Sequence, residues 1–546
     1  MIPPKGYGAV YTPDDLSYFV SRLLIKESQE YIDDLKKINI VDPACGEGSL
    51  LLSIHQTIKE KTTKKIEKLR LIGVDIDENA INNENLKKDC FGCYCFDSVL
   101  PAGGNLKNNW SSVVENINLI IANPPWSSER IYSKKELDSA GYKFNNGQYD
   151  SYVLFIELCL KITAINGYCA FILPDSLFSK ENQDLRKCLC ETTEICLIAR
   201  LGEKLFPEIN RATCILIIRK TPPTMATKTK CFRLKTEQRK QYLSGKLDLM
   251  DAYNKNVYSV KQSRFCEKRD YVFDIDVKEN EEPLLSKIEK NIISWKDSYY
   301  YDRGVEISKS GRVVICPHCS RHQSYSPNKV SKRCLECKSE IIISDSDTKA
   351  IISDSKSDNT ERIFVGENIH RYSTTGERYI QVGVDGIKYK NREIYRPPKM
   401  MIRKTGLGIN ATVDDTSSLV NQTVHICKLK NNSTKKLYYH LGLLNSRVVF
   451  YYYLKKYGEN EWKSHPYITK EIIFSLPLHA YSEEPLHEKI SELSYELSKK
   501  YTKEQDMALE QLVFKLYGLN KSEQKMILDE MNSLPDLDSI NMMKSD

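Results

Sequence analysis

An unbroken apolar segment, Ile117–Ala122, followed at once by Asn123-Pro124-Pro125-Trp126, constrains this chain more than any other feature. Such a segment is typical of a buried strand, and ligands of open α/β sheets bind at the carboxyl ends of the strands. The Asn123 side-chain oxygen and the Pro124 carbonyl can both accept hydrogen bonds from one NH2 group, because the prolines fix the backbone. Trp126 offers a flat face for a planar base. Alternatively, these residues only form a turn that ends the strand.

A second junction of this kind lies upstream, where the apolar residues Ile38–Val41 lead into Asp42–Ser49 (DPACGEGS) and then into a helical pattern. Strand, Gly-rich turn and helix form the layout of a nucleotide-type cofactor site, and Gly46 and Gly48 let the backbone approach a ligand closely. The turn lacks the lysine of an ATPase phosphate-binding loop. Alone, it would be weak evidence of a cofactor.

Acidic residues follow two further predicted strands. Leu71–Val74 ends in Asp75-Ile76-Asp77, and a carboxylate at this position is suited to ribose hydroxyl groups. The alternative role is to cap the next helix, and we assign Asp75 to ribose and Asp77 to the cap. Cys93–Phe96 ends in Asp97-Ser98, where Asp97 can accept a hydrogen bond from an adenine amino group.

Three acidic strand ends followed by Asn-Pro-Pro-aromatic resemble the S-adenosylmethionine-dependent amino-methyltransferases that act on adenine N6 in DNA. Upstream, Tyr11-Thr12-Pro13 matches the family motif that closes over the methionine part of the cofactor. Further matching segments are Lys5-Gly6, Tyr149–Tyr152, Phe155–Glu157, Gly167–Asp175, Leu205–Pro207 and Arg211–Ile218. The motif order resembles the gamma class, the Type II restriction–modification methylases with a C-terminal specificity domain, over about residues 1–220.

The resemblance implies an α/β fold, a twisted and mostly parallel seven-stranded sheet with one reversed strand and flanking helices. It also implies direct methyl transfer from S-adenosyl-L-methionine to the N6 amine of a flipped adenine. The implied catalytic residues are Asn123, Pro124, Pro125, Trp126 and Phe206. The implied cofactor-binding residues are Tyr11, Thr12, Pro13, Asp42, Ala44, Cys45, Gly46, Gly48, Asp75, Ile76, Asp97, Ser98 and Asn123.

Two of the implied catalytic residues are aromatic, Trp126 and Phe206. Trp126 stands where relatives more often have Tyr, but a ring for stacking is preserved. The resemblance gives Phe206 the aromatic contact to the flipped base, while plain core packing is its alternative role.

Four of the seventeen cysteines form two Cys-x-x-Cys pairs with fourteen residues between them: Cys316, Cys319, Cys334 and Cys337. This spacing predicts a zinc ribbon with a structural Zn²⁺. Basic residues surround the pairs, so a role facing DNA is an alternative to simple stabilisation of a small insertion. They are Arg312, Arg321, His322, Lys329, Lys332 and Arg333.

The sequence predicts three regions: a catalytic domain (1–225), a mixed α+β target-recognition domain (226–483) with the zinc ribbon at 311–342, and a helical segment (484–546). In the second region, the basic residues Arg396–Lys399 lead into Met400–Gly408, which either tracks phosphates or is an ordinary solvated strand. Residues 440–456 and 466–478 resemble the specificity domain of Type II adenine methyltransferases.

Composition limits the compartment and the partners. The first ten residues, MIPPKGYGAV, lack the features of a signal peptide, and no apolar run reaches membrane-spanning length. We therefore expect a cytoplasmic protein without membrane contact. A net charge of +7 permits a polyanionic partner, and the resemblance specifies double-stranded DNA. Only ten residues precede Tyr11, so we do not expect a fused nuclease. A separate restriction endonuclease is a further candidate partner.

Other functions use the same tetrapeptide. Methyltransferases that act on a protein glutamine amide also hold an NH2 group with Asn-Pro-Pro-aromatic, but they usually carry Tyr at the fourth position and a helical domain before the cofactor motif. Methylation of RNA bases is a third hypothesis, which the zinc ribbon keeps open. A non-enzymatic nucleic-acid-binding module is disfavoured because every cofactor position is filled.

Overall fold

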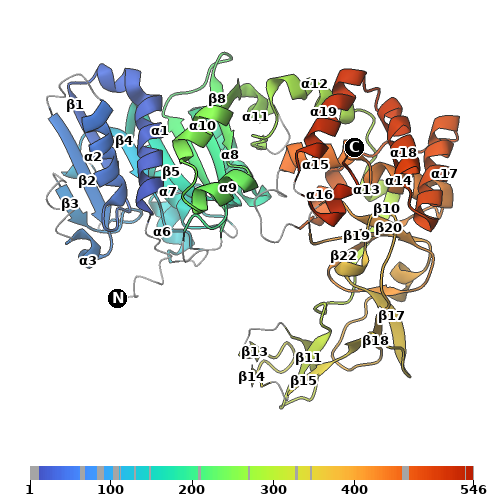
Figure 1. The fold of residues 1–546 in the computed structure, drawn as a ribbon. Helices are drawn as coiled ribbons and strands as arrows, with labels where there is room; N and C mark the ends of the chain where they lie inside the picture. Colours follow the sequence, from blue (N-terminus) through green and yellow to red (C-terminus); the bar gives the residue numbers. More distant parts are fainter. Residues whose placement is uncertain are drawn as a thin grey trace. The chain divides into compact units, whose positions relative to one another are not determined.

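The computed structural model describes residues 12–61, 68–82, 92–101, 110, 112–127, 131–146, 149–206, 211–267, 271–325, 330–344, 347–406, 408–457, 467–534 and 536–544. It comprises two compact units, and the boundary between them lies at Glu279 and Asn280 (Figure 1). No helix of the described ranges combines the length and the apolar character needed to cross a membrane.

One sheet organises the first unit. Its strands are β1 (Lys37–Asp42), β2 (Lys68–Asp75), β3 (Gly92–Cys95), β4 (Ile117–Ala122), β5 (Thr163–Pro174), β6 (Glu194–Gly202), β7 (Thr213–Arg219), β8 (Lys228–Arg233) and β9 (Tyr258–Lys261). Their order is β3-β2-β1-β4-β5-β7-β6-β8-β9. All run parallel except β7, which is antiparallel to β5 and β6, and β9, which is antiparallel to β8. Every residue of β4 is buried, as its apolar sequence predicts.

The sheet corrects the prediction of seven strands with one reversed. It has nine strands, because β8 and β9 extend it beyond β6, and two of the nine are reversed. Three basic residues in β8 (KTKCFR) weaken its apolar signal, although Cys231 and Phe232 are fully buried. The boundary placed at 225 and 226 therefore falls between β7 and β8, inside this sheet.

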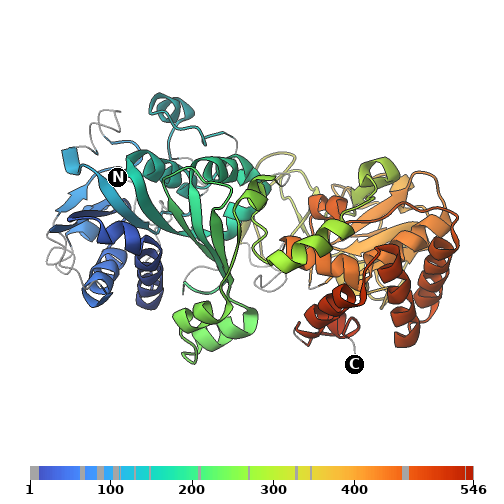
Figure 2. The ribbon, with the colours of Figure 1, turned by 90° about the horizontal axis from the view of Figure 1, so that it is seen from above.

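Helices cover both faces of the sheet. They are α1 (Asp14–Asp33), α2 (Ser49–Lys61), α3 (Glu78–Ile81), α6 (Lys134–Ser139), α7 (Tyr152–Ile162), α8 (Gln183–Thr192), α9 (Thr236–Leu243), α10 (Leu249–Asn256) and α11 (Ser263–Glu267). Figures 1 and 2 show α1, α2 and α10 on one face and α7 and α8 on the other. In α1, the buried Leu16, Val20 and Leu23 recur at helical spacing and form the stripe that faces the core.

The second unit is mixed α+β. Its two four-stranded sheets contain β10 (Tyr299–Arg303), β22 (Val424–Leu429), β19 (Lys399–Arg403) and β20 (Ala411–Asp414), and β16 (Ile352–Ser353), β18 (Tyr379–Gln381), β17 (Thr360–Phe364) and β21 (Leu419–Val420). Its helices are α12 (Glu282–Ile288), α13 (Trp295–Ser298), α14 (Thr434–Leu444), α15 (Arg447–Tyr457), α16 (Lys470–Ser475), α17 (Pro485–Lys499), α18 (Lys503–Leu516), α19 (Lys521–Asn532) and α20 (Asp538–Asn541). Because α17 packs on α14 and α19 on α15, the predicted helical segment shares the core of this unit.

A buried ion network joins three distant segments of the second unit. Arg371 forms a bidentate pair with Asp506 of α18, at 2.7 and 2.8 Å. Arg447, the first residue of α15, lies 3.1 Å from Asp506 and 3.2 Å from Glu510. All four side chains are buried, so each charge depends on the others for compensation.

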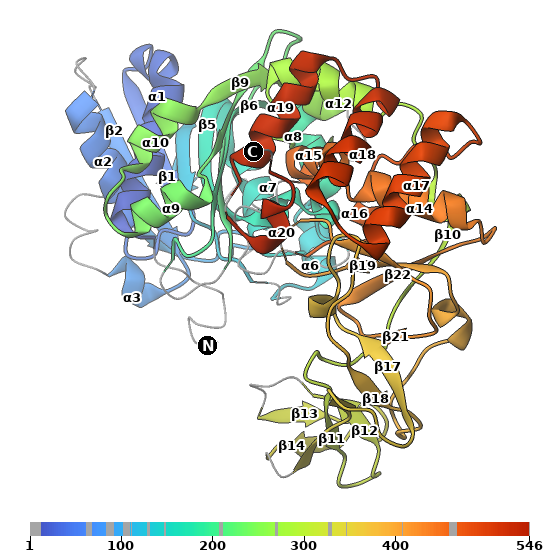
Figure 3. The same ribbon diagram turned by 45° about the vertical axis from the view of Figure 1, so that its right-hand side comes forward.

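Five short strands form a small subdomain of the second unit. They are β11 (Arg312–Ile315), β12 (His322–Ser324), β13 (Ser331–Arg333), β14 (Glu340–Ile342) and β15 (Thr348–Ala350). Figure 3 shows them grouped next to β17 and β18. The subdomain core is small and includes Val314, Tyr325 and Ile341 beside Cys316 and Cys334. A core of this size needs additional stabilisation.

Candidate active site and metal centre

The polar residues that follow β1 to β4 lie along one edge of the sheet. These strands are parallel and adjacent in the order β3-β2-β1-β4, so their carboxyl ends meet there. Hydrogen bonds connect the loops that follow them. The Gly46 N–H donates to Asp75 Oδ2 at 2.8 Å, and the Ser98 hydroxyl donates to the Pro43 carbonyl at 2.6 Å. The structure therefore brings the predicted cofactor residues after β1, β2 and β3 together.

The turn after β1 is compact. The Asp42 side chain is buried and accepts a hydrogen bond from the Ala44 N–H at 3.0 Å. Gly46 and Gly48 have φ values of +49° and +85°, a region that favours glycine. The Cys45 N–H donates to the Val74 carbonyl at 3.0 Å, which holds the turn against β2. Burial, with the nearby charge of Asp75, raises the pKa of Asp42 to about 8.

The two acids after β2 have different roles. Asp77 caps α3 by accepting from the Asn79 N–H at 2.9 Å, as the sequence predicts. Asp75 accepts from the Asp77 N–H at 3.0 Å through Oδ1, in addition to the Gly46 bond. Ile76, between them, is 45% exposed and is available for contact with a ligand ring.

Asp97 is held by three neighbours. Its Oδ1 accepts from the Val99 and Leu100 N–H groups at 2.9 and 3.1 Å. The Tyr132 hydroxyl lies 3.0 Å from both carboxylate oxygens and donates to them. No motif in the sequence singles out Tyr132, which lies 35 residues from Asp97.

The tetrapeptide after β4 contacts the N-terminal motif. The Asn123 amide nitrogen donates to the Thr12 hydroxyl at 3.0 Å, and this bond directs the amide oxygen the other way. Pro13 is the N-cap of α1, so Thr12 is placed by the start of that helix. Tyr11 lies outside the described residues. Thr12 of the N-terminal motif therefore lies beside the tetrapeptide.

Trp126 and Phe206 pack against each other. Both are buried, and their rings meet edge to face with centroids 5.2 Å apart and planes at 82°. Phe206 follows β6, far along the chain from the tetrapeptide. It therefore has the core packing of its alternative role and also lies beside the aromatic residue of the motif.

Three residues hold the tetrapeptide loop, and we call Asp150, Ser151 and Arg211 the loop brace. The Ser151 hydroxyl donates to the Pro125 carbonyl at 2.5 Å. Arg211 donates to the Trp126 carbonyl at 2.7 Å and to Asp150 at 2.8 Å. Ser151 and Arg211 thus occupy two successive carbonyls of the loop.

The Pro124 carbonyl, which precedes these two, is not occupied by the loop brace. Within the described ranges, the Pro124 carbonyl accepts no hydrogen bond, so the loop brace fixes its neighbours without occupying it. The brace residues lie in two segments that match the family, Tyr149–Tyr152 and Arg211–Ile218, but no role for them follows from the sequence. Their only local signal is a polar side chain beside a matched motif.

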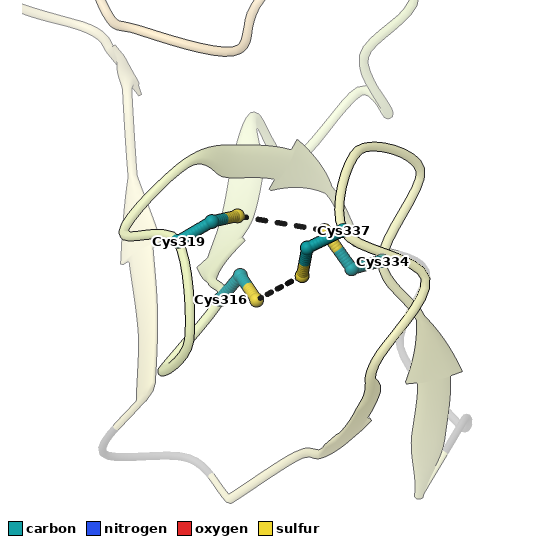
Figure 4. A group of neighbouring side chains, drawn as sticks. All are labelled: Cys316, Cys319, Cys334 and Cys337. Carbon is teal, nitrogen blue, oxygen red and sulfur yellow. Dashed lines mark hydrogen bonds between the residues drawn. The ribbon is translucent and has the colours of Figure 1, made fainter.

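The four cysteines of the predicted zinc ribbon converge. Their sulfur atoms all lie within 4.8 Å of one another (Figure 4). The Cys316–Cys337 and Cys319–Cys334 sulfur distances are 3.6 and 3.7 Å. Four thiolates at the usual Zn–S distance form a tetrahedron with edges of about 3.8 Å, so the cluster fits this ion. His318 is not among the converging groups.

The backbone turns back after each cysteine pair, and its N–H groups favour a thiolate at Cys316. Ser320 and Lys338, each just past a pair, have φ values of +60° and +63°, which turns the chain back. Although burial acts to raise the pKa of Cys316, hydrogen bonds from Ser339 and from the backbone N–H groups of Cys319 and His318 lower it overall. Gln323 donates to the Cys334 sulfur at 3.0 Å.

Most of the basic residues around the ribbon have partners inside it. Arg321 pairs with Glu336 at 2.5 Å, Lys332 donates to the Ser324 carbonyl at 2.6 Å, and Arg312 donates to Thr348 at 3.0 Å. Lys329 lies outside the described residues. These contacts give the cations structural roles and do not single out a surface for DNA.

Two protein families match the chain. Residues 3–281 match the family described as N-6 DNA Methylase, and residues 361–478 match the TaqI-like C-terminal specificity domain.

Curated relatives include restriction–modification proteins. The Type II methyltransferase M.BanIII of Aneurinibacillus aneurinilyticus is 31% identical over 221 residues, 38% of this chain and 37% of that protein. A putative Type II restriction enzyme and methyltransferase of Methanocaldococcus jannaschii, RM.MjaORFECS2P, is 23% identical over 460 residues, 80% of this chain and 34% of that protein. The chain spans about a third of the length of these relatives.

Solved structures show a similar fold over most of the chain. The Type IIL restriction-modification enzyme MmeI in complex with DNA has a TM-score of 0.53 at 12% identity, over 96% of this chain and 76% of that one. A nuclease-deletion mutant of the Type ISP enzyme LlaGI has a TM-score of 0.51 at 13% identity, over 90% and 54% of the two chains.

Proposed function

Because the chain belongs to the N-6 DNA Methylase family, we propose that it transfers a methyl group from S-adenosyl-L-methionine to the N6 amine of adenine in DNA. The observation that carries this proposal is the tetrapeptide at the end of β4, tied through Asn123 to Thr12 on the edge that holds the predicted cofactor residues. The sequence specificity would come from the second unit, which contains the TaqI-like match. A role in restriction–modification or a related defence system follows from this assignment.

The residues on the sheet edge have the chemistry that S-adenosylmethionine requires. Its ribose hydroxyls and adenine amine are donors, and the acceptors available are the carboxylates of Asp75 and Asp97. Gly46 and Gly48 form the close backbone approach, and Ile76 can contact the adenine ring. When bound, the cofactor supplies an already activated methyl group. The other described residues of the proposed set lie in this turn or in the segments around it: Thr12, Pro13, Asp42, Ala44, Cys45 and Ser98. Tyr11 belongs to the proposed set through the N-terminal motif.

The tetrapeptide would position the target nitrogen. The lone pair of adenine N6 is delocalised into the ring, so the amine is a poor nucleophile. Hydrogen bonds from N6 to the Asn123 amide oxygen and the Pro124 carbonyl favour a tetrahedral nitrogen with a localised lone pair. The Thr12 bond directs the first acceptor, and the loop brace fixes the backbone beside the second.

The target base must leave the duplex to reach this site. An extruded adenine loses its stacking, and aromatic side chains can replace it at about 1–3 kcal/mol per base. The aromatic pair formed by Trp126 of the loop and Phe206 after β6 would supply this stacking.

The test is transfer of labelled methyl to duplex DNA, with the modified bases read by sequencing. We expect N6-methyladenine at one short motif, lost in Asn123→Ala and retained in Asn254→Ala, an exposed asparagine of the same unit. Methylation of RNA or of a protein glutamine, without methylation of DNA, would refute the proposal in favour of the alternative substrates.

We also infer that the four cysteines hold a structural Zn²⁺. Four thiolates complete a tetrahedral site with no open position, which is the arrangement of structural rather than catalytic zinc. The small ribbon core supports this role, since metal binding can supply its folding free energy.

The remaining proposals concern location and partners. The relatives come from a bacterium and an archaeon, and a DNA substrate in a cell of that kind would place this chain in the cytoplasm. A separate restriction endonuclease is the partner that a methylase of such a system would have.

A further inference from the structure

Two cations lie at the same end of a sheet in the second unit. Strands β10 and β19 both pair antiparallel with β22, so their carboxyl ends point the same way. Arg303 ends β10 and lies opposite His425 of β22. Lys404 directly follows β19, and its N–H donates to the Thr423 carbonyl at 2.9 Å. Arg303 and Lys404 therefore flank the start of β22 from its two sides.

Both cations belong to the same face of the sheet. His425 lies opposite Arg303 on one side and Ile402 on the other, and Lys404 is two residues beyond Ile402. Side chains two residues apart on a strand point to the same face. Because side chains alternate between the two faces of a sheet, the Arg303 guanidinium and the Lys404 ammonium lie on the same face.

Within the described ranges, neither cation has an acidic partner at ion-pair distance. Glu306, which acts electrostatically with Arg303, pairs instead with Lys390 at 2.9 Å. Arg303 is exposed and Lys404 is half-buried. Burial, and then the positive charge of Arg303, lower the pKa of Lys404. The two cations repel each other, so an anion bound between them would stabilise both charges.

Aromatic and basic residues of the neighbouring segment border this pair. The Ile468 N–H donates to the Lys404 carbonyl at 2.8 Å and so holds the segment against β19. Tyr467, whose ring centroid is 6.0 Å from the Lys404 ammonium, is 42% exposed. Lys470 lies over the Tyr301 ring at 4.9 Å.

The other titratable groups nearby do not neutralise the pair. His425 is buried, and its pKa falls to about 4 through burial and the charges of Lys404 and Arg303, so it is neutral. Asp302 accepts from the Arg303 backbone N–H at 2.7 Å. Glu471, on α16, acts electrostatically on His425 but forms no ion pair with either cation.

We propose that Arg303 and Lys404 bind a phosphate of the DNA backbone, with Tyr467 beside them against the adjoining sugar or base; we call these three residues the phosphate clamp. The inference rests on the proposed function, and it deepens that function by assigning a backbone contact to the specificity domain. A phosphate between the two cations would compensate both charges. Contacts of this kind set the register of a protein on a duplex, and base-edge contacts then read the sequence.

The experiment compares three full-length proteins: wild type, Arg303→Gln/Lys404→Gln, and Lys428→Gln/Lys430→Gln. The last is the matched control, because it removes two charges at the opposite end of β22. The dissociation constant for a duplex of about 30 base pairs is measured between about 50 and 200 mM KCl. One duplex carries the methylated motif and the other a scrambled sequence.

We expect the clamp variant to bind both duplexes roughly tenfold more weakly and to lower the slope of log Kd against log salt by about 1 to 2. The matched control should keep the wild-type slope. Lys404→Arg should retain most of the affinity, which separates loss of charge from misfolding. An unchanged slope in the clamp variant, or an equal fall in the control, would overturn the proposal.

Two further arms separate the sources of the signal. If wild type but not the clamp variant bound inorganic phosphate at about 10 mM, while the two proteins bound DNA equally at the same ionic strength, the site would bind free phosphate rather than DNA. If the wild type bound DNA with the expected slopes but methylated no base, the proposed reaction would fail while the phosphate clamp stood.

Discussion

Replacing Arg211 by methionine tests whether the loop brace positions the tetrapeptide. Arg211 donates to the Trp126 carbonyl at 2.7 Å and to Asp150 at 2.8 Å, and methionine keeps an unbranched stem without either donor. The substitution therefore removes two hydrogen bonds and leaves the strand β7 that follows unchanged. The Pro124 and Asn123 acceptors would lose the support of the residues next to them.

The magnitude follows from the two bonds. The Arg211 side chain is 39% exposed, so solvent screens its pair with Asp150, and that pair contributes about 0–1 kcal/mol. The bond from a charged donor to the Trp126 carbonyl contributes about 1.5–3 kcal/mol. If most of this free energy holds the loop in its reactive position, methyl transfer slows about 10- to 100-fold, since about 1.4 kcal/mol corresponds to tenfold.

Single-turnover methylation with saturating cofactor and DNA measures this rate. Arg219→Met is the matched control. Arg219 ends β7, the strand that follows Arg211, is 33% exposed and pairs with Glu194 at 3.3 Å, but contacts no part of the tetrapeptide loop in the described structure. We expect it to retain a rate within about threefold of wild type, which is under 1 kcal/mol. Equal rates for the two variants would refute the positioning role of Arg211.

Two further predictions concern stability and metal. The folded-state pKa of Asp42 is raised from 3.8 to about 8, so its contribution to stability is present at acidic pH and lost as the pH rises toward 8. Relative to Asp42→Asn, the free energy of unfolding of the wild type should fall by up to about 1.4 kcal/mol per pH unit between pH 4 and 8; parallel urea-unfolding profiles would contradict this. Cys316→Ser should lower the zinc content measured by mass spectrometry from about one ion per chain and lower the melting temperature, whereas Cys188→Ser, outside the cluster, should change neither.

The local sequence was sufficient to predict those features that depend on a few neighbouring residues. The buried strand before Asn123, the Asp77 cap and the convergence of the four cysteines all follow from short patterns with a direct physical meaning. The family and the specificity domain followed from the order of such patterns along the chain.

Features that depend on contacts between distant residues could not be predicted from the sequence. Arg211 meets Trp126 across 85 positions, and nothing near either residue encodes the pairing. Strand β8 is amphipathic and basic, and only its place beside β6 shows that Cys231 and Phe232 belong to the first core. The predicted boundary at residues 225 and 226 separates β8 from β6, because their pairing cannot be read from the local sequence.

The ion network of the second unit limits how this protein can exchange target specificity with its relatives. Arg371 lies among the strands of the TaqI-like match, whereas its partner Asp506 lies in α18, beyond residue 478 where that match ends. A chimera joined between them would bury the Arg371 guanidinium opposite a foreign helix, at a cost of about 3–5 kcal/mol if the carboxylate is missing. A segment that transfers target specificity between relatives therefore has to include α18. In natural chimeras, we expect the junctions between parental sequences to lie outside residues 371–510.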